Sequence, residues 1–328
     1  MSKKCGIIGL PNVGKSLLFN KLTKTNKAQS ENYPFCTIDP NIGFLTYEDD
    51  KLKALANFGK SRKTIYSYIE LYDIAGLVKN ASKGEGLGNQ FLANIRSVNA
   101  IIHVVRGFSD DDVIHIMDRV DPINDYYIIQ LELIEADIKH IDNKIPKTKS
   151  AADVKELEGL KSLLLETVNS SEETFDFSKH KEHQDAILSI STKFGLDLLS
   201  MKPQVVLING HNDEMNEFCE KNHISHVSIN ISTINQEEIN SICEAIYEKL
   251  NLICFFTTGE VETRAWMIKN ESNAREASGE IHSDFPKKFI KAKVTTYDSY
   301  STSTPKTTME KGDYIVRNRD IIEFAIGK

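Results

Sequence analysis

The sequence contains no apolar run that approaches the roughly 20 residues needed to cross a bilayer, so we expect no membrane partner. Cysteine is scarce: five residues among 328, an odd number without close pairs, argue against a disulfide framework. We therefore expect a reducing, cytoplasmic location and no disulfide-linked partner. The net charge is −7, so any contact with nucleic acid must come from a local basic patch. We also expect no signal peptide, because residues 1–4 run directly into the first predicted strand.

What the sequence does contain is a phosphate-binding loop (P-loop), Gly9-Leu10-Pro11-Asn12-Val13-Gly14-Lys15-Ser16. Residues 5–8 before it read as a buried strand, and apolar residues at helical spacing follow it. In this order of strand, loop and helix, backbone N–H groups converge on phosphates. Lys15 is expected to act in catalysis at the β- and γ-phosphate oxygens, and the Ser16 hydroxyl to bind Mg²⁺. The predicted nucleotide-binding residues of the loop are Asn12, Val13, Gly14, Lys15, Ser16 and Leu17.

Two downstream segments fit the metal side of such a site. Residues 33–41 are polar and carry prolines, and Thr37 among them is the candidate that completes the Mg²⁺ shell as a switch. The run from Ile65 to Tyr72 alternates like a strand and ends in Asp-Ile-Ala-Gly. There Asp73 is expected to hold Mg²⁺ through a water, and the Gly76 N–H to contact the γ-phosphate. The next residue is a leucine where many GTPases place a water-orienting glutamine, which predicts slow turnover.

The base-reading loop is expected after the apolar strand at residues 203–208. GTPases read guanine there with Asn-Lys-x-Asp, whereas this chain has Asn209-Gly210-His211-Asn212, with neither the lysine nor the acid. We predict that Asn209 and Gly210 contact the nucleotide. Without the carboxylate, strong guanine selection is not expected, and our hypothesis is that adenine is preferred. A slipped loop that uses Asp213 instead remains an alternative.

The chain divides into three predicted parts. Residues 1–122 and 197–251 alternate strands and helices, which predicts an α/β nucleotide-binding domain with a mostly parallel sheet flanked by helices. Within residues 123–196, apolar residues at spacings of four and three predict two helices of an antiparallel coiled-coil arm; simple core helices are the alternative. The break between them carries three lysines, a basic tip that could touch phosphate backbones or be a solvated loop. Residues 252–328 read as a small α+β binding module, with short strands around one helix at 286–290.

Taken together, the P-loop, residues 35–41 and residues 73–79 resemble the YchF family, the Obg-like ATPases. The likeness continues through residues 84–92 and 120–122 and resumes at 264–266 and 281–285, so it covers nearly the whole chain. The resemblance implies a GTPase-like domain, a coiled-coil arm and a C-terminal TGS domain with a ubiquitin-like β-grasp fold. It also implies Mg²⁺-dependent hydrolysis of ATP in preference to GTP. The implied partner is the ribosome, at its large subunit, with contact to ribosomal RNA through the arm and the TGS domain.

The resemblance assigns two further residues. A histidine on a loop is thought to replace the missing glutamine in this family, and the matching position is His115, whose imidazole could orient a water. Asn12 resembles the loop asparagine that recruits K⁺ in related enzymes. This chain departs from the family at Asn212, where an acidic residue is usual.

Other interpretations remain open from the sequence. A GTP-selective switch of the Obg type and a nucleotide-independent scaffold for the ribosome or RNA are the competing functions. Cys219, His223, His226 and Cys243 could be imagined as a zinc site, but their spacing matches no common pattern and ordinary packing is favoured. For Cys36, beside Thr37, an inert thiol is favoured over a redox-sensitive one.

Overall fold

The computed structural model describes residues 3–24, 41–74, 87–109, 120–169, 174–300 and 305–327. Its main sheet has the strand order β2-β4-β1-β5-β8-β9. These strands are β2 (Ile42–Tyr47), β4 (Ser67–Asp73), β1 (Lys3–Ile8), β5 (Ala100–Arg106), β8 (Gln204–Asn209) and β9 (His226–Ile229). Only β2 runs antiparallel to its neighbour. The predicted mostly parallel sheet is therefore confirmed.

Helices cover both faces of this sheet because its central strands are apolar on both sides. Along β8, Val205 and Leu207 belong to one core cluster, and Val206 and Ile208 belong to another. This alternation follows from the two-residue period of a strand. The helices are α1 (Lys15–Lys24), α3 (Leu87–Arg96), α7 (Asp213–Lys221) and α8 (Gln236–Lys249). Parallel sheets need this double cover, and it leaves the carboxyl ends of the strands free to form a site.

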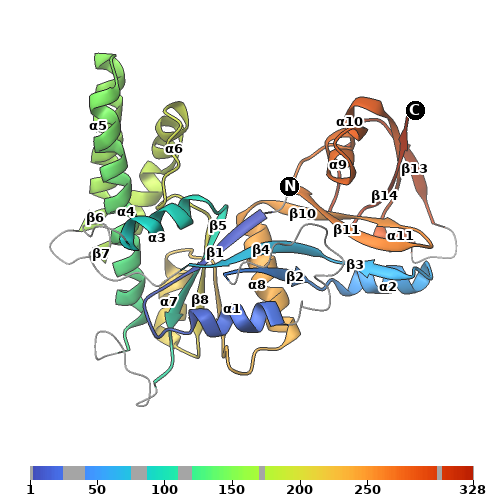
Figure 1. The fold of residues 1–328 in the computed structure, drawn as a ribbon, viewed down its shortest axis with the longest axis horizontal. Coiled ribbons are helices and arrows are strands. Elements are labelled where there is room, and N and C mark those ends of the chain that lie inside the picture. Colours follow the sequence, from blue (N-terminus) through green and yellow to red (C-terminus); the bar gives the residue numbers. More distant parts are fainter. Residues whose placement is uncertain are drawn as a thin grey trace.

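The segment between β5 and β8 forms helices that project from one side of the sheet (Figure 1). These are α4 (Pro122–Lys144), the short 3₁₀ turn η2 (Ile145–Lys147), α5 (Ala151–Glu166) and α6 (Phe177–Lys193), with a small ladder of β6 (Val168–Asn169) and β7 (Thr174–Phe175). Asp121 caps α4 and Ser150 caps α5, each by accepting from a backbone N–H in the first turn. The two helices predicted from the apolar spacing are present, and α6 is a third that the spacing did not predict.

The core-helix alternative also holds for part of α4. Ile134 and Ile141 pack with Leu157, Leu160 and Leu164 of α5 in a separate cluster, as the apolar spacing of four and three residues predicts. Ile129 and Leu133, nearer the start of α4, lie instead in the core of the main sheet. One helix therefore serves two cores, because apolar residues cover more than one of its faces.

A second sheet has the order β13-β12-β14-β10-β11-β3. Its strands are β13 (Thr307–Glu310), β12 (Phe289–Thr295), β14 (Ile321–Ile326), β10 (Leu252–Thr258), β11 (Glu262–Lys269) and β3 (Lys63–Ile65). The helices near it are α2 (Asp50–Phe58), α9 (Ala274–Ile281), α10 (Phe285–Lys288) and α11 (Tyr297–Tyr300). The predicted helix at 286–290 ends early, since β12 starts at Phe289, and α9 was missed. The run 314–316 makes one isolated bridge, from Ile315 to Asn273, and no strand.

The two sheets pack on a common core and use neighbouring segments of the chain, an arrangement that no local sequence pattern predicts. The predicted strand from Ile65 to Tyr72 is two strands: β4 joins the main sheet, whereas β3 pairs in parallel with β11 of the second. Along β10, Cys254 and Phe256 pack into the main core, and Phe255 faces α9 in the second. Figure 1 shows β3 and α2 reaching beneath the C-terminal strands. The second sheet is therefore built partly from the N-terminal part of the chain.

A network of hydrogen bonds centred on Asp49 and Arg319 links the two sheets. Asp49 is buried and uses both carboxylate oxygens: Oδ1 accepts from the Lys51 N–H at the start of α2, and Oδ2 accepts from Arg319 Nε at 2.7 Å. Arg319 also donates to the Tyr47 hydroxyl at 3.2 Å, and that hydroxyl donates to Glu244 at 2.7 Å. Residues far apart in the sequence are thus tied together at one buried carboxylate.

We expect Asp49→Asn to lower the free energy of unfolding by about 1–3 kcal/mol. The asparagine still caps α2 but presents an amide N–H₂ to the Arg319 guanidinium, which leaves a partly buried cation without its carboxylate and with only the Tyr47 hydroxyl as an acceptor. The matched control is Glu323→Gln, which breaks an exposed pair with Lys293 and should cost less than about 1 kcal/mol. Urea denaturation of both variants checks the prediction, and equal losses would contradict it.

None of the described helices is both long enough and apolar enough to cross a membrane.

Candidate functional site

The P-loop lies between β1 and α1, at the carboxyl edge of the main sheet. Its backbone adopts conformations that ordinary side chains avoid: φ is +151° at Gly9, +64° at Asn12 and +106° at Gly14. A Cβ at Gly9 would collide with the Val104 carbonyl oxygen of β5, and one at Gly14 would lie 2.7 Å from the Asn209 side-chain nitrogen. Both glycines are therefore required by close packing against neighbouring strands. The turn leads into α1 with the first N–H groups of the helix at its head, the arrangement that binds phosphate.

Lys15 is the first residue of α1 and lies almost entirely inside the loop. It is 8% exposed, and its ammonium donates to the Leu10 carbonyl at 2.6 Å. Burial lowers the pKa of Lys15 to about 8, while the Asp73 carboxylate acts in the opposite direction. A buried ammonium with one backbone acceptor is poorly compensated, so a bound anion would stabilise its charged form.

Ser16 and Asp73 both carry side-chain oxygens near Lys15: Ser16 follows it in α1, and the Asp73 carboxylate is close enough to affect its pKa. Ser16 is exposed in the first turn of α1, and Asp73 ends β4, directly opposite Ile7 of β1 in the register. Asp73 also donates its backbone N–H to Asn41, which lies just before β2. A hydroxyl and a carboxylate suit Mg²⁺, which is usually bound by one or two protein oxygens together with substrate phosphates. The described residues contain no cluster of three or more His, Cys, Asp or Glu that could hold a metal without such help.

The Asn209 side chain connects the P-loop to the segment that follows β9. It is the last residue of β8 and is 7% exposed. Its Nδ2 donates to the Val13 carbonyl at 3.0 Å, and its Oδ1 accepts from the Ile231 N–H at 3.2 Å. Gly210 follows with φ +103° and donates to Ile229 at 2.7 Å. The structure thus brings Asn209 and Gly210 together with the P-loop, and Asn209 holds the loop in place.

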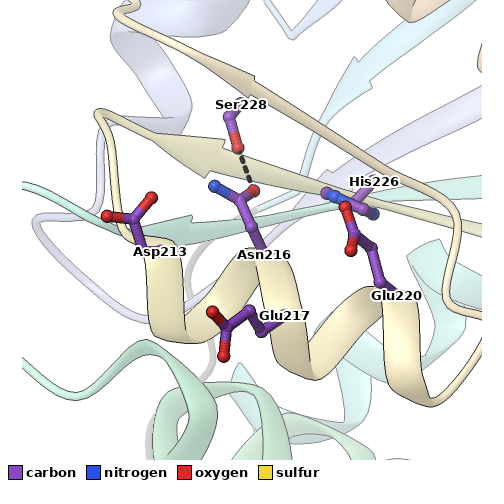
Figure 2. A pocket seen from close by; sticks show the side chains of 6 residues that line it. All are labelled: Asp213, Asn216, Glu217, Glu220, His226 and Ser228. Atoms are coloured by element: carbon purple, nitrogen blue, oxygen red, sulfur yellow. Dashed lines mark hydrogen bonds between the residues drawn. The ribbon is translucent and has the colours of Figure 1, made fainter.

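The loop after Gly210 does not present a buried acid. Asn212 begins α7, and its side chain caps the helix by accepting from Met215 N–H at 2.8 Å. Asp213 is 82% exposed and pairs with His211 at 2.9 Å. Figure 2 shows Asp213 at the start of α7, with Glu217 and Glu220 along the same helix. These residues line a shallow acidic pocket with Asn216, His226 and Ser228. Asn212 therefore has a capping role, and Asp213 faces solvent.

Three of the predicted site residues, Thr37, Gly76 and His115, lie outside the described residues, as does Cys36. Asn12, Val13, Gly14, Lys15, Ser16, Leu17, Asp73, Asn209 and Gly210 are described, and all lie at the carboxyl edge of the main sheet. Within this set, Val13 and Lys15 are buried, and Asn12, Ser16 and Leu17 are exposed.

Sequence reasoning missed two buried polar residues of β5. Arg106 is 1% exposed and lies opposite Asn209; its Nε donates to the Phe108 carbonyl at 3.1 Å, and its guanidinium lies 4.5 Å from the Phe108 ring centre. His103 is fully buried, and burial lowers its pKa to about 3, with the Lys15 charge contributing. The available signal was the presence of His and Arg in an otherwise apolar strand, since such residues are rarely buried without a role.

The imagined zinc site does not form. Cys219 and Cys243 are both buried free thiols but lie in different core clusters, on opposite faces of the main sheet. Burial raises the pKa of both thiols, so neither is a ready metal ligand.

Comparison with known proteins agrees with a P-loop nucleotide-binding domain followed by a C-terminal module. A family model described as a 50S ribosome-binding GTPase matches residues 4–149, and the YchF-GTPase C-terminal model, described as a protein of unknown function (DUF933), matches residues 252–327. The chain is 35% identical to the "Ribosome-binding ATPase YchF" of Bacillus subtilis (strain 168) and 39% identical to that of Buchnera aphidicola subsp. Acyrthosiphon pisum. Each match covers 99% of both proteins.

The solved structure of the Schizosaccharomyces pombe YchF GTPase superposes with a TM-score of 0.74 at 26% identity, over 99% of this chain and 98% of that one. The resemblance that rested on short motifs thus extends over the full length of sequence and fold. The chain belongs to the YchF family.

Proposed function

We propose that this protein is a cytoplasmic nucleoside triphosphatase that binds and slowly hydrolyses ATP and associates with ribosomes. One observation carries the proposal: Lys15 is buried at the head of α1, inside a loop whose two glycines are fixed by β5 and Asn209. A buried cation beside converging N–H groups is matched by a triphosphate and by few other ligands. The names of the relatives, ribosome-binding ATPases, agree with it.

In this proposal Asn12, Val13, Gly14, Lys15, Ser16 and Leu17 contact the phosphates, and Ser16, Thr37 and Asp73 hold Mg²⁺. Bound there, Mg²⁺ would neutralise charge on the β- and γ-phosphate oxygens. Lys15 adds positive charge at the same oxygens, and Gly76 N–H contacts the γ-phosphate. Asn12, exposed with φ +64°, is the proposed residue for K⁺; equal turnover in K⁺ and Na⁺ buffers would contradict that role.

Discrimination between bases is proposed to favour ATP. Asn212 caps α7 and Asp213 is solvent-exposed, so the described loop offers no buried carboxylate to guanine N1 and N2. Titration of the protein with ATP and with GTP in the presence of Mg²⁺ tests this. We expect ATP to bind at least as tightly as GTP. Tighter GTP binding by two orders of magnitude would instead support a GTP-selective switch.

Loss of the Lys15 charge should weaken nucleotide binding at alkaline pH. Below its pKa of about 8 the ammonium is charged and attracts the triphosphate; above it, the free protein must take up a proton to bind. We expect the affinity for Mg²⁺-ATP to fall by up to about tenfold per pH unit above pH 8. Kd values measured from pH 7 to 9.5 check this. Lys15→Arg keeps its charge over that range, so a wild-type slope as flat as that of the variant would contradict the assignment.

The projecting helices and the C-terminal sheet are the proposed contact surfaces for the ribosome. Residues 123–196 form the proposed coiled-coil arm and 252–328 the proposed TGS domain of β-grasp type, around a nucleotide-binding domain of residues 1–122 and 197–251. At the arm tip Lys147 and Lys149 are exposed, whereas Lys144 is folded back to donate to the Phe194 carbonyl at 2.6 Å. Contact with the large subunit and its RNA would use the two exposed lysines.

Co-sedimentation with ribosomes, with and without nucleotide, tests this part. We expect nucleotide to change the bound fraction of the wild-type protein and to leave Lys15→Ala unaffected. A bound fraction independent of nucleotide in both proteins would favour the scaffold function. His115 is the proposed water-orienting residue, and unchanged turnover in His115→Ala with normal nucleotide binding would refute it.

A further inference from the structure

A cavity of about 670 Å³ lies where the projecting helices meet the main sheet, and we call it the arm-base cavity. One wall is a face of α6, which contributes Phe177, Lys181, Gln184 and Leu188 at helical spacing. The start of β8 and the turn between α7 and β9 also line the cavity. Its volume falls within the range of sites for small ligands.

The arm-base cavity is separate from the P-loop. Gln204, which lines it, is the first residue of β8, whereas Asn209, which holds the P-loop, is the last. At about 3.3 Å per residue these two ends are roughly 17 Å apart. A ligand in the cavity would therefore lie at the opposite edge of the sheet from a nucleotide in the P-loop.

Its polar wall is held in a fixed orientation. Gln130 of α4 donates from Nε2 to Gln204 Oε1 at 2.8 Å, and Gln204 Nε2 lies 2.8 Å from His103 Nδ1. His103 is fully buried and stacks on Tyr126 with ring centres 5.2 Å apart. The chain of bonds fixes which way each amide faces, so the wall is ordered before any ligand arrives. Gln204 is half-buried, and its amide keeps one N–H and one oxygen lone pair for the edge of a heterocyclic base.

The other wall is apolar and partly open. Leu188 is 41% exposed, although it is a large apolar side chain on the cavity-facing side of α6. Phe177 is half-buried and packs edge-on against Phe175 at 4.8 Å. Leu188 lies eleven residues from Phe177 on α6, about 16 Å along the helix, so the Phe177 ring by itself is the favourable surface for a flat group.

The charge of the lining is of one sign. Lys181, Lys202 and Lys249 line the cavity, and no carboxylate is among the described residues that line it. Lys202 is already paired with Asp197 at 3.0 Å, but Lys181 and Lys249 are exposed and have no ion-pair partner within the described part of the chain. This is unusual in a protein of net charge −7, and it differs from the pocket at α7, where three carboxylates gather. The cavity therefore favours an anion.

We propose that the arm-base cavity is a second ligand site that takes a nucleoside phosphate. The base lies between the Phe177 ring and the Gln204 amide, and the phosphate lies at Lys181 and Lys249. The site is independent of the P-loop and does not require that loop to act as an ATPase.

Photolabelling of the full-length protein with 8-azido-AMP and 8-azido-GMP, followed by mapping of the labelled peptides, tests the proposal. We expect label within residues 175–204, which include residues that line the arm-base cavity and exclude the proposed base-reading loop at 209–213, in the wild type and equally in Lys15→Ala. The double variant Lys181→Ala/Lys249→Ala should raise the probe concentration needed for half-maximal labelling of that segment about tenfold.

The matched control is Lys179→Ala, which removes a lysine from the same helix that pairs with Glu182 and does not line the cavity. Its labelling should equal that of the wild type. Label confined to the P-loop (residues 5–17) and the proposed base-reading loop (209–213), or labelling of 175–204 that the double variant and the control change equally, would overturn the proposal.

Discussion

Lys15→Met is expected to reduce ATP turnover by a factor of about 10³ or more. The removed ammonium is the positive charge that the structure places inside the P-loop, and single charges that act on the transferred phosphoryl group are worth about 10³–10⁵ in rate. The fold should not suffer, because methionine fills the same space and no longer needs an acceptor for a buried charge. Single-turnover hydrolysis together with thermal unfolding measures both effects.

Lys21→Ala is the matched control on the same helix. Its ammonium donates to the Ser232 carbonyl at 2.8 Å and is remote from the P-loop turn. Turnover in this variant should remain within about twofold of the wild type. Equal losses in the two variants would mean that α1 as a whole, rather than the Lys15 charge, sets the rate.

Asp137→Ala is expected to lower the free energy of unfolding by about 3 kcal/mol, the largest stability effect that we predict. Asp137 of α4 is fully buried and accepts three hydrogen bonds, from Leu199 N–H at 2.8 Å, Ser200 N–H at 2.9 Å and the Ser200 hydroxyl at 2.7 Å. Burial raises its pKa to about 6, so at pH 7.5 the group is ionised and serves all three donors. Alanine would remove the acceptor from the buried Leu199 N–H and the partly buried Ser200 N–H, and the melting temperature should fall by roughly 4 °C.

Asp142→Ala provides the comparison, since Asp142 lies on the same helix but forms an exposed pair with Lys161 at 2.7 Å. Its loss should cost less than about 1 kcal/mol. A similar destabilisation in both variants would show that the buried carboxylate has no special part in joining α4 to the start of β8.

The P-loop could be predicted from sequence because all its determinants lie within a few residues. Glycines, lysine and serine at fixed spacing between an apolar run and a helical pattern require that local geometry whatever surrounds them. The pairing of α4 with α5 could also be predicted from the spacing of their apolar residues, because helical periodicity is a local property of the sequence. By contrast, α6 was missed: much of it is charged or polar, and only Ile187 and Ser191 are buried.

The sequence by itself determined the P-loop, the mostly parallel sheet and the helices α4 and α5, since each depends on residues close together in the chain. Only the tertiary structure decided that β3 joins the C-terminal sheet, that Asp49 binds Arg319, and that the Asn209 side chain holds Val13. Those contacts join residues separated by about 200 positions or more. Nothing local distinguishes a strand of one sheet from a strand of another, so the choice is made by the apolar faces and buried polar groups that must find partners when the whole chain packs.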